Sequence, residues 1–203
     1  MNSFKKQYEV TKREPLYQGV FSLSRYHIRH ALFNGGWSEV IARELLERKS
    51  AVGVLPYDPI LDQVVLIEQF RPGPVPHKAN PWLIEIVAGV YEEKEKPEQA
   101  AERETVEEAG CTILDLHPIS DYFVSPGGSN EHIYLFCGRV DASKATGIHG
   151  LAEEHEDIRA FALSAEDAFA MWQRGEIKTG PASVSLLWLQ IHRPELRKKW
   201  KNS

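Results

Sequence analysis

The stretch GVYEEKEKPEQAAERETVEEAGC, residues 89–111, combines a helix signal with a high density of carboxylates. Pro97 suits the first turn of a helix, the Ala, Glu and Gln residues that follow favour its body, and Gly110 ends it. The sequence therefore predicts a helix over residues 97–109.

Three glutamates gather on one side of this predicted helix. Glu104 and Glu108 are four residues apart and so share a face, which Glu107 borders. Like charges at this spacing destabilise an isolated helix, and a bound cation would relieve the repulsion. Ligands that offer only oxygen favour Mg²⁺ or Mn²⁺ over Zn²⁺. The alternative, from this run alone, is a solvated acidic helix face.

Arg103 directly precedes the first of these glutamates. Its planar guanidinium can donate two parallel hydrogen bonds to one carboxylate, and Glu95 and Glu85 are both candidates for that partner. We expect such a pair to fix the orientation of the carboxylate.

The whole stretch resembles the Nudix box. That pattern is a glycine, five residues, a glutamate, seven residues, Arg-Glu, an aliphatic residue, any residue, Glu-Glu, any residue, a glycine and an aliphatic residue. The seven fixed positions are all present as Gly89, Glu95, Arg103, Glu104, Glu107, Glu108 and Gly110. Thr105 and Cys111, both small, stand at the two aliphatic positions.

The resemblance implies an α/β fold, specifically an α/β/α sandwich on a mixed β-sheet, and a metal-dependent hydrolase of nucleoside diphosphate compounds. It implies that Glu104 and Glu108 bind the metal directly, together with the carbonyl oxygen of Ala88. We assign Glu107 and Arg103 to the catalytic group around this metal.

A second acidic segment, residues 150–157 (GLAEEHED), holds four carboxylates within five residues. By itself it is as well explained as a soluble surface loop. The resemblance implies that Glu156 is a further metal ligand and that Glu154 is the general base that activates water after the loop closes. His155 lies between them and is interpreted as a bystander.

Flanking stretches are similar to the ADP-ribose pyrophosphatase branch of the family over nearly the whole chain. They are YQGVFSL (17–23), LFNG (32–35), VLIEQFR (65–71), SPGG (125–128) and GIHGLA (147–152). This likeness implies cleavage of ADP-ribose into AMP and ribose 5-phosphate. Val20 departs from the pattern, because some relatives place an aromatic ring there to stack on adenine.

Five residues are predicted to bind the substrate. Glycine allows a ligand to approach the backbone closely at Gly127 and Gly128, and Glu131 can accept hydrogen bonds from ribose hydroxyls. A tight turn is the alternative explanation for the two glycines. The resemblance implies that Arg71 contacts a phosphate, which suits a guanidinium, and that Arg43 reaches a neighbouring site across a homodimer interface.

Hydrophobic periodicity and turn residues predict two domains. Residues 1–48 form an antiparallel β segment, with strands at 24–33 and 37–46 joined at the Asn34-Gly35-Gly36 turn. The resemblance implies that this segment contributes to dimerisation and substrate contact. Residues 49–203 form the hydrolase domain. We expect its strands at 51–55, 64–70, 82–88, 132–140 and 158–163, its other helices at 164–175 and 183–192, and a long loop at 141–157.

Composition limits the remaining classes. The chain has 203 residues, 42% of them hydrophobic, a net charge of −5 and two cysteines. These values favour a globular protein without a disulfide framework, and they give no basic excess for nucleic acid. The start of the chain lacks the apolar core of a signal peptide, and no apolar run reaches membrane-spanning length, so we expect a cytoplasmic protein with no membrane partner.

Three hypotheses remain open. The first is a homodimeric ADP-ribose pyrophosphatase. The second is a Nudix hydrolase for another nucleotide-sugar or a dinucleotide. The third is a non-catalytic ADP-ribose sensor on the same scaffold, against which the intact set of carboxylates argues.

Overall fold

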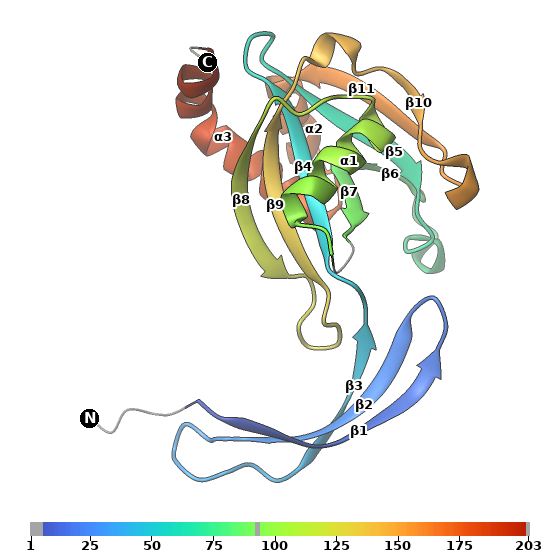
Figure 1. Cartoon of the computed structure of the whole chain (residues 1–203), viewed down its shortest axis with the longest axis vertical. Coiled ribbons are helices and arrows are strands. Elements are labelled where there is room, and N and C mark those ends of the chain that lie inside the picture. The colour runs from blue at the N-terminus through green and yellow to red at the C-terminus, as the bar shows by residue number, and fades with distance from the viewer. Residues whose placement is uncertain (1–5, 92–93, 202–203) are drawn as a thin grey trace. The chain divides into compact units, whose positions relative to one another are not determined.

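The computed structural model describes residues 6–91 and 94–201, so the outermost residues of both predicted domains, 1–5 and 202–203, lie outside it. The chain divides into two compact units (Figure 1). The N-terminal unit comprises the residues up to Lys49 together with Phe123–His132, and the large unit comprises Ser50–Tyr122 and Ile133–Ser203.

The N-terminal unit contains an antiparallel sheet of three strands in the order β1-β2-β3. They are β1 (Tyr8–Gln18), β2 (Ser22–His30) and β3 (Ile41–Glu47). Gly35 and Gly36 have positive φ angles of 89° and 78° between β2 and β3, as the predicted turn requires. The predicted antiparallel segment is confirmed, although strand β1 lies before the first strand expected from sequence, which was placed at 24–33. Its residues are almost all exposed, so hydrophobic alternation gave no signal there.

The large unit is built on a mixed sheet in the order β10-β11-β5-β4-β9-β8, with β6 paired to β5 and β7 paired to β4. Its strands are β4 (Ala51–Asp58), β5 (Gln63–Phe70), β6 (Trp82–Glu85), β7 (Val87–Val90), β8 (Asp115–Phe123), β9 (His132–Arg139), β10 (Gly147–His149) and β11 (Ile158–Ser164). The ladder between β4 and β9 is parallel, whereas β4 is antiparallel to β5 and β7.

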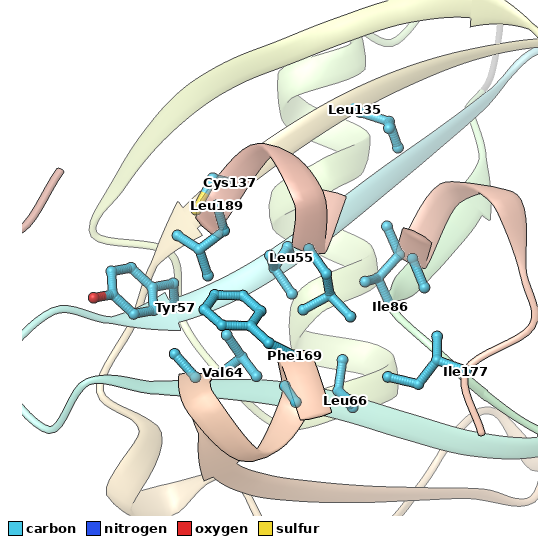
Figure 2. Close-up of a cluster of buried hydrophobic side chains, with 14 of the residues drawn as sticks. Leu55, Tyr57, Val64, Leu66, Ile86, Leu135, Cys137, Phe169, Ile177 and Leu189 are labelled. Carbon is cyan, nitrogen blue, oxygen red and sulfur yellow. The ribbon is translucent and has the colours of Figure 1, made fainter. Parts of the chain in front are cut away.

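The helices cover both faces of this sheet, which confirms the predicted α/β/α sandwich. They are α1 (Pro97–Ala109), α2 (Ala165–Gln173) and α3 (Gly180–Lys201). Alternate residues of one strand separate the two cores, since Val52 and Val54 pack with α1 whereas Leu55 and Tyr57 pack with α2 and α3 (Figure 2). In Figure 1, α1 lies in front of the sheet and α2 and α3 lie behind it.

The first strand of this unit is longer than the predicted 51–55, because β4 continues through Pro56 to Asp58. On one side of β4, the ladder with β7 ends at Val54 and the ladder with β5 begins at Tyr57. Pro56 lies between the two ladders, so its missing N–H interrupts neither of them.

The single strand predicted over residues 82–88 is two strands with different neighbours. β6 pairs with β5 and ends at Glu85, whereas β7 pairs with β4 and continues to Val90. The partner changes at Ile86. As a result, Glu85 lies beside β5, and Ala88 and Gly89 lie beside β4.

The predicted loop 141–157 contains short elements, namely a 3₁₀ turn at Ala142–Lys144, strand β10 and a second 3₁₀ turn at Ala152–Glu154. No helix within the described part of the chain is long and apolar enough to cross a membrane.

Helix α3 continues beyond the predicted end at residue 192, with Pro194 inside it. Ion pairs and burial hold the distal part. Arg193 and Arg197 both donate to the carboxylate of Asp62, at 2.5–2.9 Å, and the Tyr57 hydroxyl donates to the same group at 2.6 Å. Trp200 near the end of the helix is fully buried. These contacts outweigh the cost of an internal proline.

We expect Asp62→Asn to lower the free energy of unfolding by about 2 kcal/mol, because two guanidinium groups lose their shared carboxylate. Asparagine tolerates the left-handed backbone of residue 62, where φ is 59°, so the substitution isolates the charge. Urea unfolding measures the change. Glu166→Gln is the matched control, since this exposed carboxylate pairs with the same Arg193 and its loss should change little. Equal effects in both variants would contradict the assignment.

Candidate active site

Helix α1 and strand β7 approach each other closely at Gly89. A Cβ atom placed on Gly89 would lie only 1.9 Å from Oε1 of Glu104, which is closer than any side chain permits. Glycine at this position therefore lets the Glu104 carboxylate lie directly against the backbone of β7.

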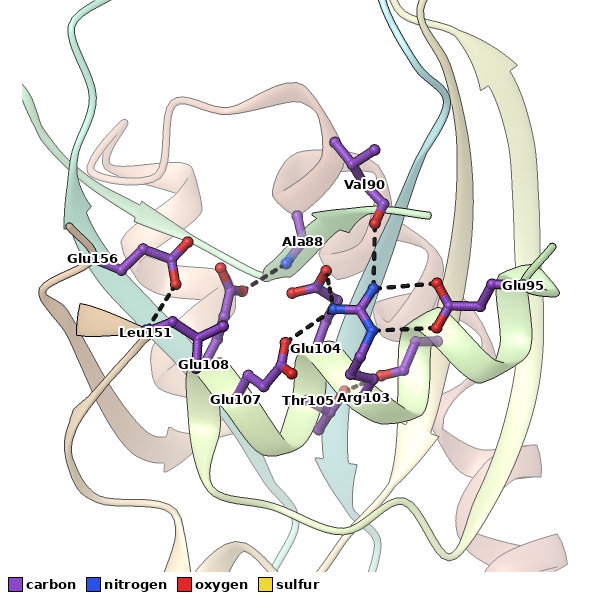
Figure 3. Close-up of polar contacts among 11 residues, drawn as sticks. Ala88, Val90, Glu95, Arg103, Glu104, Thr105, Glu107, Glu108, Leu151 and Glu156 are labelled. Atoms are coloured by element: carbon purple, nitrogen blue, oxygen red, sulfur yellow. Dashed lines mark hydrogen bonds and ion pairs between the residues drawn. The ribbon is translucent and has the colours of Figure 1, made fainter. Parts of the chain in front are cut away.

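Glu108 is the most deeply buried carboxylate of the site, with 2% of its surface exposed. The backbone N–H of Ala88 donates to its Oε2 at 2.9 Å (Figure 3). Burial, with added repulsion from Glu104 and Glu156, raises the pKa of Glu108 to about 8. One hydrogen bond does not offset the cost of burying this charge, so the ionised form needs a nearby cation.

Arg103 joins three carboxylates of the same region. Its guanidinium donates to Glu95 at 3.2 Å, to Glu104 at 2.8 Å and to Glu107 at 2.9 Å, and it also reaches the carbonyl oxygen of Val90 at 3.3 Å (Figure 3). The hydrogen bond with Glu95 contributes most to raising the pKa of Arg103. The predicted pairing with Glu95 is confirmed.

The other candidate partner of Arg103, Glu85, is engaged elsewhere. Its Oε2 accepts from Nε of Arg71 at 2.8 Å and from Nε2 of Gln69 at 3.3 Å. Within the described residues, Glu85 therefore pairs with Arg71, which is predicted to bind phosphate, and not with Arg103 of α1.

The second acidic segment, residues 150–157, is hydrogen-bonded to α1 through its own first residue, Gly150. The N–H of Gly150 donates to the carbonyl oxygen of Glu107 at 3.1 Å, and the N–H of Leu151 donates to Oε2 of Glu156 at 3.1 Å. Gly150 has a φ of 98°, and a Cβ there would lie 2.6 Å from Cβ of Glu156. Burial raises the pKa of Glu104 as it does that of Glu108, and the tight turn brings the charge of Glu156 close enough to add to both increases. Glu154 lies exposed on the 3₁₀ turn.

These carboxylates suit a hard divalent cation, because Glu104, Glu108 and Glu156 offer only oxygen atoms as ligands. Across residues 6–91 and 94–201, no three Asp, Glu, His or Cys side chains already converge at ligand distances. Small side-chain rotations would therefore accompany ion binding. The buried Glu108, with its raised pKa and single N–H partner, supports this fit.

The raised pKa of Glu108 predicts a specific pH dependence of stability without divalent ions. Between the ordinary carboxyl pKa of 4.5 and the folded value of about 8, the folded protein holds a proton that the unfolded chain has lost. The contribution of Glu108 to the free energy of unfolding should therefore decrease, by on the order of a few kcal/mol, as pH rises through this window. Urea titrations at several pH values, with chelator present, measure it. A Glu108→Gln variant that keeps the same pH slope would contradict the shift.

The other predicted binding residues belong to the N-terminal unit. Arg43 is exposed, and its Nη1 donates to the carbonyl oxygen of Ala42 at 2.9 Å. A Cβ at Gly127 or Gly128 would meet nothing within 4 Å, so packing within the chain does not require glycine there.

Glu131 has a partner that sequence analysis missed. Arg48 donates to its carboxylate at 2.8 Å, and the guanidinium lies 4.9 Å from the ring centroid of Phe21. No local pattern links residues 83 positions apart, which is why the pair was not predicted.

The chain is also similar to known proteins over most of its length. Residues 47–181 match the family described as NUDIX domain. The chain is 44% identical over 196 residues to an ADP-ribose pyrophosphatase from Escherichia coli (strain K12), covering 97% of this chain and 94% of the relative. A protein of the same description from Haemophilus influenzae is 44% identical over 198 residues, covering 96% and 91%.

More distant matches include a relative named for a different substrate and a solved structure with a similar fold. A GDP-mannose pyrophosphatase from Enterobacter sp. (strain 638) is 34% identical over 151 residues, which cover 73% of this chain and 78% of the relative. A crystal structure described as an ADP compounds hydrolase superposes with a TM-score of 0.71 at 16% identity, covering 97% of this chain and all of the other. The latter likeness supports the fold alone.

Proposed function

Because this chain belongs to the Nudix family of hydrolases, we propose that it cleaves the diphosphate bond of ADP-ribose, giving AMP and ribose 5-phosphate, with Mg²⁺ or Mn²⁺ as cofactor. The observation that carries the proposal is the buried carboxylate of Glu108 beside Glu104 and Glu156. Identity of 44% over almost the whole chain to ADP-ribose pyrophosphatases favours ADP-ribose among possible substrates.

Glu104, Glu108 and Glu156 would hold the metal, together with the carbonyl oxygen of Ala88. When bound, divalent cations neutralise charge on the phosphate oxygens and make attack by water easier. The chain then has to keep its ligands in place. Arg103 does this for Glu104, since it holds that carboxylate from one side while Glu95 holds the guanidinium from the other.

Water activation is assigned to Glu154. Its exposed carboxylate lies two residues from Glu156, so a movement of residues 150–157 can bring it to the diphosphate while Glu156 stays near α1. Glu154 would accept the proton of the attacking water. Glu107 contributes through Arg103, which it holds at 2.9 Å.

Five residues are assigned to substrate binding. Arg71 would donate to a phosphate, and Glu131 would accept from ribose hydroxyls beside the open backbone of Gly127 and Gly128. Arg43 would contribute to the site of a partner subunit in a homodimer. We place this homodimer in the cytoplasm, where the buried thiols of Cys111 and Cys137 would stay reduced.

A nucleotide-sugar is the second candidate substrate, because GDP-mannose pyrophosphatases match the chain at 30–35% identity. Incubation with Mg²⁺ and a panel of ADP-ribose, GDP-mannose and dinucleoside polyphosphates separates the possibilities. We expect the highest kcat/KM with ADP-ribose. Faster turnover of GDP-mannose would favour the second candidate, and tight ADP-ribose binding without turnover would indicate a sensor.

A further inference from the structure

Arg71 is the first residue after strand β5, and both its backbone and its side chain are held in place. Its backbone N–H donates to the carbonyl oxygen of Pro81 at 2.8 Å, so the chain on either side of the connecting segment is fixed at this point. Its side chain is held as well, because Nε donates to Oε2 of Glu85 at 2.8 Å. Gln69, which is itself buried, donates to the same oxygen at 3.3 Å.

The contact engages only one edge of the guanidinium. Among the residues that the structure describes, no hydrogen bond or ion pair engages Nη1 or Nη2 of Arg71. These two nitrogens carry the remaining four N–H donors, which suit the oxygens of one phosphate group. The side chain of Arg71 is 42% exposed, so its outer edge is open to a ligand.

The backbone links the partner of this guanidinium to the proposed metal ligands. Glu85, which accepts from Arg71, ends strand β6, and Ala88, three residues later, donates its N–H to Glu108. Arg71 is therefore held by the segment of chain that also contacts the proposed metal site, which suits a contact with a diphosphate.

Glu85 is unexpected in such a place. Its side chain is only 16% exposed, and a carboxylate near a bound diphosphate repels it. Its charge therefore does not serve to attract the substrate. Its contact with Nε does restrict rotation of the Arg71 side chain. Without this contact the side chain would sample many rotamers, and fixing it when substrate binds would cost conformational entropy.

We propose that Glu85 is a positioning residue that orients Arg71 so that its Nη donors face one phosphate of the diphosphate, with Gln69 locking Glu85 in turn. This inference rests on the proposed function. It assigns Glu85 an effect on substrate affinity that is exerted entirely through Arg71.

The first test is Glu85→Ala. We expect KM for ADP-ribose to rise about tenfold while kcat changes less than about threefold, since contacts present in both ground and transition states act on KM. Glu85→Gln retains an oxygen that can accept from Nε, so it should recover part of the affinity. Glu68→Ala is the matched control. It removes a carboxylate that pairs with Arg159 on the same sheet, and KM should stay unchanged.

The decisive test is a double-mutant cycle. In an Arg71→Ala background, Glu85→Ala should cause no further loss of affinity. Calorimetric titration of ADP-ribose into the protein with chelator present gives the same cycle without turnover, and thermal unfolding shows whether each variant is folded. If Glu85→Ala does not fold, Glu85→Gln carries the cycle.

Two outcomes would overturn the inference alone while wild-type turnover of ADP-ribose stays intact. One is an equal loss of affinity with and without Arg71, and the other is a fall in kcat at constant KM. Absence of wild-type turnover would instead overturn the proposed function.

Discussion

Glu108→Gln is expected to lower kcat for ADP-ribose by roughly 10³-fold or more, because a bound metal contributes several kcal/mol to transition-state stabilisation. The substitution is nearly isosteric. Its amide oxygen can still accept from the N–H of Ala88, which now donates at 2.9 Å. The fold should therefore be retained, and a buried charge is removed. Steady-state kinetics with saturating Mg²⁺ and a urea unfolding curve measure the two effects.

Glu102→Gln is the matched control for this prediction. Glu102 lies on the same helix, but its side chain faces solvent. Its loss should leave kcat unchanged. Near-normal turnover in the Glu108→Gln variant would refute the assignment of this carboxylate to the metal.

Glu154→Gln is expected to lower kcat by roughly 10²- to 10⁴-fold, which is the usual contribution of a general base. Its effect should differ in kind from that of Glu108→Gln. Affinity for Mn²⁺, measured by calorimetry, should stay close to wild type, because Glu154 is exposed on its 3₁₀ turn and is not among the proposed ligands.

Glu153→Gln controls for a general loss of charge in this segment and should keep full activity. If Glu154→Gln also turns over at the wild-type rate, another carboxylate of residues 150–157 or a different group activates the water.

Local signals predicted the helix to which most carboxylates of the proposed metal site are assigned. Pro97 at the first turn and Gly110 with a φ of 64° bound α1 as expected, because both act through the backbone of their own residues. The spacing along one helix also placed Glu104 and Glu108 together. Such features depend on neighbours within a few residues, which is the range that a single sequence reveals.

Elements stabilised by distant contacts were missed. Strand β8 contains Pro118 and many exposed residues, which the end position of the sheet tolerates but which give no strand pattern. The distal part of α3 depends on Asp62, more than 130 residues away. The partners of Arg71 and Glu131 were missed for the same reason, since pairing across strands cannot be deduced from either residue alone.

We propose that carboxylates of α1 and of residues 150–157 hold divalent cations against a diphosphate. Anomalous diffraction from crystals grown with Mn²⁺ and a non-hydrolysable ADP-ribose analogue would locate these cations. We expect an anomalous peak within about 2.3 Å of carboxylate oxygens of Glu104, Glu108 and Glu156, a distance typical of hard-cation ligands. A Mn²⁺ peak elsewhere, with these side chains turned to bulk solvent, would refute the proposed metal site.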